Sequence, residues 1–239
     1  MRTLSNAPHA ATLQREIDTL LFDLDGTLYP VDGGYPAHVR TNLFRYMKES
    51  LGMEDPQAVW WPLFQKYNQT LRALRAAGYE INQEDYWEKC REGAGDFLVT
   101  APAEVQAALA SFPQDKYVFT NCAEKQAKEA LRLLGIEHHF KKVYGADFMG
   151  DCCKPEEAAF RKVLQDIGAQ PDHTALFEDS FKNLRMAKGL GMATVFISSE
   201  TRAEEGVHDE ELKLVDAVAN QITEVELHPQ VPWLWPRAN

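Results

Sequence analysis

Two carboxylates stand two residues apart in the segment TLLFDLDGTLYP, residues 19–30. Asp23 and Asp25 end an apolar run, and because side chains alternate along a strand, both point to the same side of the chain. Like charges this close repel strongly in a low dielectric, and a shared proton or a bound cation relieves that repulsion. The pair therefore predicts a chemical role, either in covalent and acid–base chemistry or in metal binding.

Polar residues of matching chemistry follow three other apolar segments. Thr120 and Asn121 end the second, Lys154 precedes the helix after the third, and Glu178 and Asp179 end the fourth. Ligands of an open parallel sheet bind at the carboxyl ends of its strands, so these groups converge on one edge. Carboxylates without histidine or cysteine suit Mg²⁺, while a lysine, a hydroxyl and backbone N–H groups bind phosphate oxygens. The set predicts phosphoryl transfer, with one carboxylate attacking and another moving the proton.

The elements that must position these residues follow from apolar patterning. Short β-branched or aromatic runs predict five buried strands, at residues 19–25, 116–120, 142–146, 174–179 and 193–197. Helical patterns separate the last four strands, and one of them has Pro155 at the expected first helical position. Alternating strands and helices predict an α/β fold with a doubly wound, Rossmann-like parallel sheet.

Residues 33–112 interrupt this alternation with several helical patterns and no convincing strand. We expect a small helical bundle inserted after the first strand. The core domain then comprises residues 1–32 and 113–239. The tail HPQVPWLWPRAN is rich in proline and tryptophan, and we expect an irregular segment whose tryptophans dock on the chain's own core.

The ordered segments DLDGT, FTN, CKP and EDSFKN resemble the four motifs of the haloacid dehalogenase (HAD) superfamily over residues 19–200. The resemblance implies that the helical insert is a cap over the active site. It implies Asp23 as nucleophile and metal ligand, and Asp25 as general acid/base that gives its backbone carbonyl to Mg²⁺. Thr120 and Lys154 would bind the phosphoryl group.

The fourth motif supplies the remaining acids of the implied site. Asp179 would be the third protein ligand of Mg²⁺, with Glu178 and Asn183 close by.

A narrower resemblance is to the pyrimidine 5'-nucleotidase-like branch, in the segments FDLDGTLYP, KYNQTLRAL and FEDSFKNLRMAKGLGM. It implies hydrolysis of a small phosphomonoester such as UMP or CMP. Besides Thr120, Asn121 and Lys154, the candidate substrate-binding residues are Tyr29, Tyr67 and Arg72. Residues 67–68 read Tyr-Asn where the branch usually reads Tyr-Gly, which leaves the substrate open.

Composition limits the partners and the location. The 239 residues are 45% hydrophobic and 26% charged, which is typical of a soluble globular protein. A net charge of -11 argues against a nucleic-acid polymer or an anionic membrane as partner, but not against a small phosphorylated ligand.

Four cysteines without a C-x-x-C pair indicate reduced thiols and a cytoplasmic location. Arg2, Ser5 and Arg15, with no acid before Glu16, leave organelle targeting open. We expect a monomer or a weak homodimer.

Other functions remain open at this point. The phosphoester could be a sugar phosphate or pyridoxal phosphate, a phosphomutase could return the phosphoryl group to a sugar, and a regulatory protein could keep the fold without turnover. A dehalogenase is disfavoured, because its halide leaves without protonation and it has no need of the acids at Asp25 and Asp179.

Overall fold

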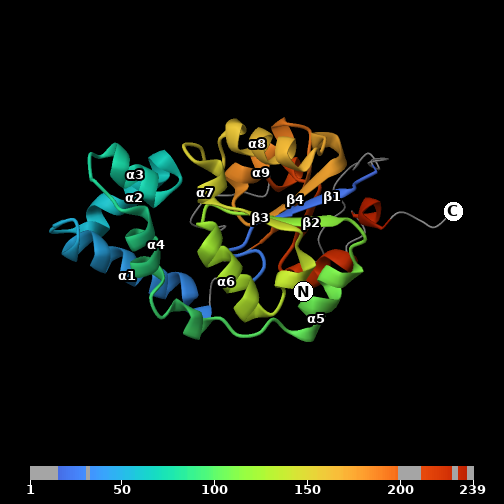
Figure 1. Cartoon of the computed structure of the whole chain (residues 1–239). Coiled ribbons are helices and arrows are strands. Elements are labelled where there is room, and N and C mark those ends of the chain that lie inside the picture. Colours follow the sequence, from blue (N-terminus) through green and yellow to red (C-terminus); the bar gives the residue numbers. More distant parts are fainter. Residues whose placement is uncertain (1–15, 31–32, 199–210, 228–230, 236–239) are drawn as a thin grey trace.

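The computed structural model of this chain describes residues 16–30, 33–198, 211–227 and 231–235. In that part of the chain, parallel strands form one sheet in the order β3-β2-β1-β4-β5-β6 (Figure 1). The strands are β1 Thr19–Phe22, β2 Asp115–Phe119, β3 Lys142–Tyr144, β4 Thr174–Glu178, β5 Ala193–Ile197 and β6 Ala217–Ala219. The predicted α/β fold with a parallel sheet is confirmed, and β6 is an additional edge strand that the sequence did not indicate.

Both faces of the sheet are buried, as the apolar strands predict. Leu20 and Phe22 of β1 point into one hydrophobic cluster, while Leu21 points into a second cluster on the opposite face. Helices α5 (Ala103–Ser111) and α6 (Glu124–Leu134) cover the first face, and α8 (Glu157–Ile167) and α9 (Phe181–Gly189) cover the second (Figure 1). Because β2, β1 and β4 are neighbours in the sheet and run parallel, their carboxyl ends lie together at one edge.

Helices separate the last four predicted strands as expected, but one of them begins later than the sequence indicated. Helix α6 ends at Leu134 and is followed by Gly135, whose φ of 72° places it in the left-handed region that glycine adopts readily. Helix α8 begins at Glu157, so the expectation of Pro155 as its first residue is wrong. A turn precedes the helix, in which the Glu156 backbone N–H donates to the Cys153 carbonyl over 2.8 Å. The short helix α7 is Ala146–Met149.

Four helices of the insert form a lobe of their own beside the sheet (Figure 1). They are α1 Tyr35–Glu49, α2 Pro56–Tyr67, α3 Thr70–Ala76 and α4 Gln83–Arg91. Leu43, Met47, Leu74 and Trp87 belong to a third hydrophobic cluster, which lies mostly in this lobe and reaches Ala123 and Ala146 of the sheet domain. Asn82 caps α4, since its Oδ1 accepts the Asp85 backbone N–H over 3.0 Å. A short 3₁₀ helix at Ala94–Phe97 leads back to the sheet domain.

Helix α5 packs on the sheet rather than on this lobe. Leu109 of α5 and the following Phe112 belong to the same cluster as Phe22, and the Phe22 and Phe112 rings lie 6.1 Å apart. The division into domains stays a proposal, and this packing favours ending the insert before α5 rather than at residue 112. Trp235 stacks on Phe112 and its Nε1 donates to the Ser111 carbonyl over 3.1 Å, so the described part of the tail docks on the core.

The structure bears on the expectation about membranes, but not on the one about organelle targeting. Of the helices described, none is both long and apolar enough to cross a membrane. The segment in which organelle targeting stays open, residues 1–15, lies outside the described residues.

Candidate active site

A buried lysine joins the ends of β1, β2 and β4. The Lys154 Nζ donates to Asp23 Oδ1 over 2.6 Å, to Glu178 Oε2 over 2.7 Å and to the Phe119 carbonyl over 2.7 Å. Lys154 is 1% exposed, so its charge depends on these partners rather than on water. The structure thus brings Asp23, Lys154 and Glu178 together at the edge where the sequence predicts a site.

The carboxylates outnumber the lysine. Burial and the charge of Glu178 raise the pKa of Asp23 to about 8, although Lys154 opposes this. Burial, Glu178 and Asp23 likewise raise the pKa of Asp179 well above its ordinary value. The pKa of Lys154 is raised, because its two carboxylate partners outweigh the effect of burial. Three acids around one ammonium group leave an excess of negative charge that a cation would neutralise.

The donor set fits a hard cation. Asp23, Glu178 and Asp179 each offer a carboxylate oxygen, and these atoms lie within 4.8 Å of one another. All three donors are oxygen, which suits Mg²⁺ and not a metal that prefers sulfur or imidazole. The Asp25 side chain is not in this group. Its implied contribution to the metal is a backbone carbonyl, and that stays a prediction.

Asp25 is held by a buried tyrosine. The Tyr29 hydroxyl donates to Asp25 Oδ1, and burial together with the charge of Asp25 raises the Tyr29 pKa well above its ordinary value. The Tyr29 ring packs edge-on against Tyr35 at 5.4 Å. Tyr29, which the sequence suggests as a pocket residue, thus fixes the acid implied to carry the proton.

The second motif positions Lys154. Asn121 Oδ1 accepts the Lys154 backbone N–H over 2.9 Å, and its Nδ2 donates to the Lys154 carbonyl over 3.0 Å. Thr120 is buried, and its Oγ1 accepts the Cys122 backbone N–H over 3.1 Å. Asn183, also buried, lies in the first turn of α9. Their expected contacts with a phosphoryl group or a metal stay predictions.

The turn between α2 and α3 docks on this motif. Gln69 Nε2 donates to the Asn121 carbonyl over 2.8 Å, and Asn121 Nδ2 also donates to the Asn68 carbonyl over 3.2 Å. Asn68 has a φ of 56°, and glycine and asparagine adopt this left-handed conformation most readily. Asparagine in place of the expected glycine therefore preserves the backbone of the turn.

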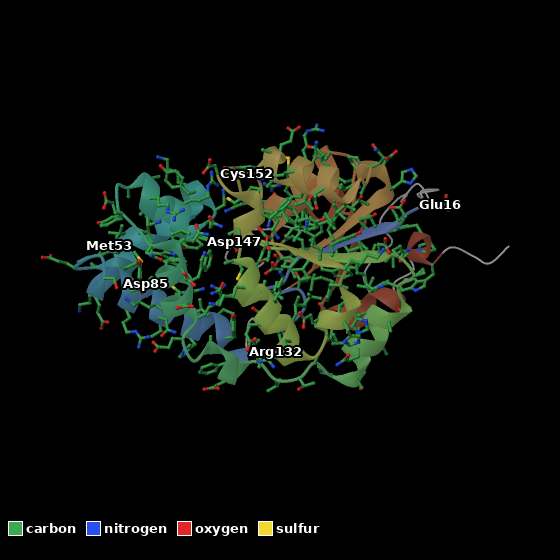
Figure 2. The ribbon with its side chains drawn as sticks, viewed as in Figure 1. Glu16, Met53, Asp85, Arg132, Asp147 and Cys152 are labelled. Carbon is green, nitrogen blue, oxygen red and sulfur yellow. The ribbon has the colours of Figure 1, made fainter. Side chains whose placement is uncertain are left out.

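Arg72, a candidate substrate residue, bridges the lobe and the sheet domain. Its Nη2 donates to Glu156 Oε1 over 2.9 Å, and its Nη1 to Cys153 Sγ over 2.7 Å. A second bridge joins Gln83 of α4 to Asp147, which lies at the junction of the two parts (Figure 2). Tyr67 ends α2 next to the docked turn, and Lys66 lies 5.0 Å from its ring centre. Substrate contacts of Arg72 and Tyr67 stay predictions.

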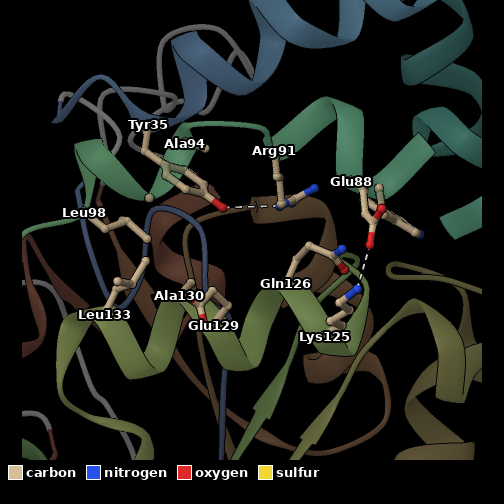
Figure 3. Close-up of a pocket in the computed structure, with 12 residues that line it drawn as sticks. Tyr35, Glu88, Arg91, Ala94, Leu98, Lys125, Gln126, Glu129, Ala130 and Leu133 are labelled. Atoms are coloured by element: carbon tan, nitrogen blue, oxygen red, sulfur yellow. Dashed lines mark hydrogen bonds and ion pairs between the residues drawn. The ribbon is translucent and has the colours of Figure 1, made fainter. Parts of the chain in front are cut away.

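Arg91, at the end of α4, is a residue that the sequence analysis missed. Its Nε donates to the Tyr35 hydroxyl over 3.2 Å (Figure 3). Its guanidinium lies 5.0 Å from the Trp87 ring centre. Burial lowers the pKa of Arg91, but nearby groups including Asp25 more than offset this and raise it. The segment EKCRE, residues 88–92, has the composition of a charged stretch exposed to solvent. Only the apolar Trp87 before it and Cys90 within it, both buried in the structure, indicated that one face of this helix is covered.

A family model for haloacid dehalogenase-like hydrolases matches residues 17–191, which include all four motifs and the insert. The chain belongs to the haloacid dehalogenase-like hydrolase family. The family predicted from the four ordered motifs is confirmed.

Proteins similar to this chain carry nucleotidase and phosphatase names. The chain is 27% identical to a 5'-nucleotidase from Pseudomonas aeruginosa over 210 residues, covering 79% of this chain and 89% of the relative. It is 25% identical to a phosphoglycolate phosphatase from Chromobacterium violaceum, covering 77% and 86%. A HAD phosphatase from Thermococcus onnurineus superposes with a TM-score of 0.63 at 17% identity, covering 88% and 97%. The last comparison bears on the fold alone.

Proposed function

We propose that this HAD-family protein is a Mg²⁺-dependent phosphomonoesterase that acts through an aspartyl-phosphate on a small phosphorylated metabolite, with a pyrimidine 5'-nucleotide as the favoured substrate. The observation that carries the proposal is the buried contact of Lys154 with Asp23 and Glu178 beside Asp179. This arrangement holds a carboxylate at a strand end, next to a cation that can accept phosphoryl charge.

Asp23 is the nucleophile of the proposed first step. Lys154 binds Oδ1, and among the described residues no donor binds Oδ2. An oxygen lone pair of Asp23 forms a bond to phosphorus while the bond from phosphorus to the ester oxygen breaks. The electron pair of that bond stays on the leaving oxygen, which takes a proton from the Asp25 carboxyl group.

Water completes the reaction in the second step. The ionised Asp25 removes a proton from water, whose oxygen attacks phosphorus and releases the Asp23 carboxylate with inorganic phosphate. Tyr29 holds the Asp25 carboxylate through both proton transfers. Lys154 and the groups around Thr120 bind the non-bridging oxygens.

Mg²⁺ would be held by Asp23, Asp179 and the backbone carbonyl of Asp25, and would offset the negative charge of the phosphoryl group when bound. The donor chemistry described above supports this assignment.

The substrate assignment rests on likeness. The 5'-nucleotidase relative favours a nucleotide, and the resemblance to the pyrimidine 5'-nucleotidase-like branch favours a pyrimidine base, since the left-handed backbone at Asn68 is one that the branch's glycine also adopts readily. The phosphoglycolate phosphatase relative favours a small phosphorylated acid as second candidate. A monomeric or weakly dimeric state and a cytoplasmic location stay predictions.

Substitution of the nucleophile tests the proposal. With Mg²⁺ and a panel of phosphomonoesters including UMP, we expect the Asp23→Asn variant to keep the fold and to lose turnover by a factor on the order of 10⁴ or more. Asp172→Asn is the matched control, because Asp172 is exposed and precedes the opposite end of β4. Near-wild-type phosphate release by Asp23→Asn contradicts the proposal, and an isomerised product in excess of free phosphate indicates a phosphomutase.

A further inference from the structure

Helix α2 presents an apolar face to solvent. Pro56 is its one buried residue, and seven of its other residues are exposed, with Lys66 as the only charged one. The exposed residues include Pro62, together with Val59 at 42% and Trp61 at 40% exposure. A surface helix normally turns charged and polar residues to water, so a contiguous apolar face of this kind indicates a contact surface.

Another side of α2 already packs within the lobe. Trp60 lies edge-on against Phe44 of α1 with 5.6 Å between the ring centres, and its Nε1 donates to Thr70 Oγ1 of α3 over 2.9 Å. The exposed apolar residues of α2 are therefore not required for the packing of the lobe itself, and a second surface would be needed to cover them.

A row of four exposed residues runs along α2. Asp55, Val59, Pro62 and Lys66 are separated by four, three and four positions, the spacing that places side chains on one side of a helix. The row begins with an acid, has an apolar centre and ends with a base. Glu54, also exposed, adds a second acid at the beginning.

The charges at the two ends of this row are not paired within the described part of the chain. Asp55 caps α2 by accepting the Ala58 backbone N–H over 3.1 Å, and neither Asp55 nor Glu54 contacts a cation there. Lys66 lies 5.0 Å from the centre of the Tyr67 ring and forms no ion pair with any described residue. The row therefore offers unpaired charges of opposite sign at its two ends.

We propose that two copies of this chain associate through α2, with the two helices antiparallel across a two-fold axis. In that arrangement the acidic start of each row faces Lys66 of the other copy, and Val59 meets Pro62 at the centre. The opposed helix dipoles attract each other as well. Because a helix of 12 residues is only about 18 Å long, its face is smaller than the roughly 800 Å² that each partner of a stable dimer buries, and the dimer is weak and reversible.

Sedimentation velocity of the full chain, from micromolar to near-millimolar concentration, tests this association. We expect the wild type to shift from monomer toward dimer as its concentration rises, and Val59→Glu to stay monomeric, because the dimer would bury two unpaired carboxylates at its centre. Val99→Glu is the matched control, since Val99 is 76% exposed and lies outside α2, and it should associate as the wild type does. Circular dichroism checks that both variants are folded.

Exchange of the end charges tests the antiparallel pairing itself. One variant, Glu54→Lys with Asp55→Asn, makes the start of the row basic and keeps a capping side chain. The other variant, Lys66→Glu, makes the end of the row acidic. Each variant alone sets like charges against each other in both contacts of the dimer, so we expect its dissociation constant to rise about 10-fold or more. An equimolar mixture restores two contacts of opposite charge, and a mixed dimer should form with an affinity close to that of the wild type.

Three results would contradict a dimer through α2. They are a wild type that stays monomeric over the whole concentration range, a dimer that Val59→Glu does not weaken, and charge variants that form no mixed dimer. Slower phosphate release by Val59→Glu with unchanged association would assign the apolar face to the path of the substrate instead. The association is independent of the proposed phosphatase function, so a chain without turnover can still form this dimer.

Discussion

Lys154 is the residue on which the charge balance of the site depends. Its ammonium group compensates Asp23 and Glu178 in a place that water does not reach. Such an ion pair adds little net stability compared with an apolar core, but removing one partner leaves the other charges buried and unpaired.

Replacement of Lys154 by methionine should therefore destabilise the protein. We expect Lys154→Met to lower the free energy of unfolding by about 3–5 kcal/mol, measured by urea denaturation. Lys141→Met is the control, because Lys141 forms an exposed ion pair with Asp115, and its denaturation midpoint should stay close to wild type. Equal midpoints for both variants would show that Lys154 does not compensate the buried acids.

The sequence predicts the place of a site residue where that residue belongs to one of the four motifs, and not where it lies on a helix of the insert. Asp23 and Glu178 follow from the rule that parallel strands present their carboxyl ends at one edge, and Lys154, in the turn before α8, follows from the segment CKP of the third motif. Arg91 could not be found this way, since its approach to Tyr35 depends on how α4 packs against the start of α1 within the insert.

Among the elements, the turn at residues 67–70 joins the insert to the second motif. Asn68 adopts a positive φ there, and its carbonyl accepts a hydrogen bond from Asn121. The conformation of one residue in the insert therefore affects the position of a residue that holds Lys154.

Substitutions at Asn68 test this conformation. Asn68→Gly should keep the free energy of unfolding within a few tenths of a kcal/mol, whereas Asn68→Ala should lower it by about 1 kcal/mol, because its Cβ disfavours the left-handed region. Urea denaturation provides the comparison, with Gln65→Ala at an exposed position of α2 as control. If alanine is as stable as glycine at position 68, the turn does not need a positive φ.

The sequence predicted five of the six strands that the structure describes and the main helices between them, because their apolar patterns are strong. Strand β6 is three residues long at the sheet edge and gives almost no periodic signal. The start of α8 was misjudged because Pro155 belongs to the turn before the helix. Helix α5 looks like the helices of the insert, and only the packing of Leu109 and Phe112 separates it from them.

For the whole molecule, the proposed binding of Mg²⁺ at the acidic cluster would couple metal binding to stability. An ion that binds the folded chain through Asp23 and Asp179 stabilises it by about 2.7 kcal/mol at a concentration 100 times its Kd. The unfolded chain does not bring these side chains together, so the effect requires the fold.

Thermal unfolding measures this coupling. We expect saturating Mg²⁺ to raise the melting temperature of the wild type and to have little effect on Asp179→Asn. The Asp172→Asn variant should respond as the wild type does, since Asp172 is remote from the cluster. An unchanged melting temperature of the wild type would argue against Mg²⁺ as the cation of this site.

The most direct test of the central claim is chemical trapping of the aspartyl-phosphate. The enzyme is mixed with Mg²⁺ and a substrate found in the panel, quenched during turnover and reduced with borohydride, and its peptides are analysed by mass spectrometry. Reduction of an acyl phosphate converts the carboxyl carbon to an alcohol, so we expect homoserine at position 23 and an unmodified residue 25. Homoserine at another position, or none during active turnover, would contradict the assignment of Asp23 as the nucleophile.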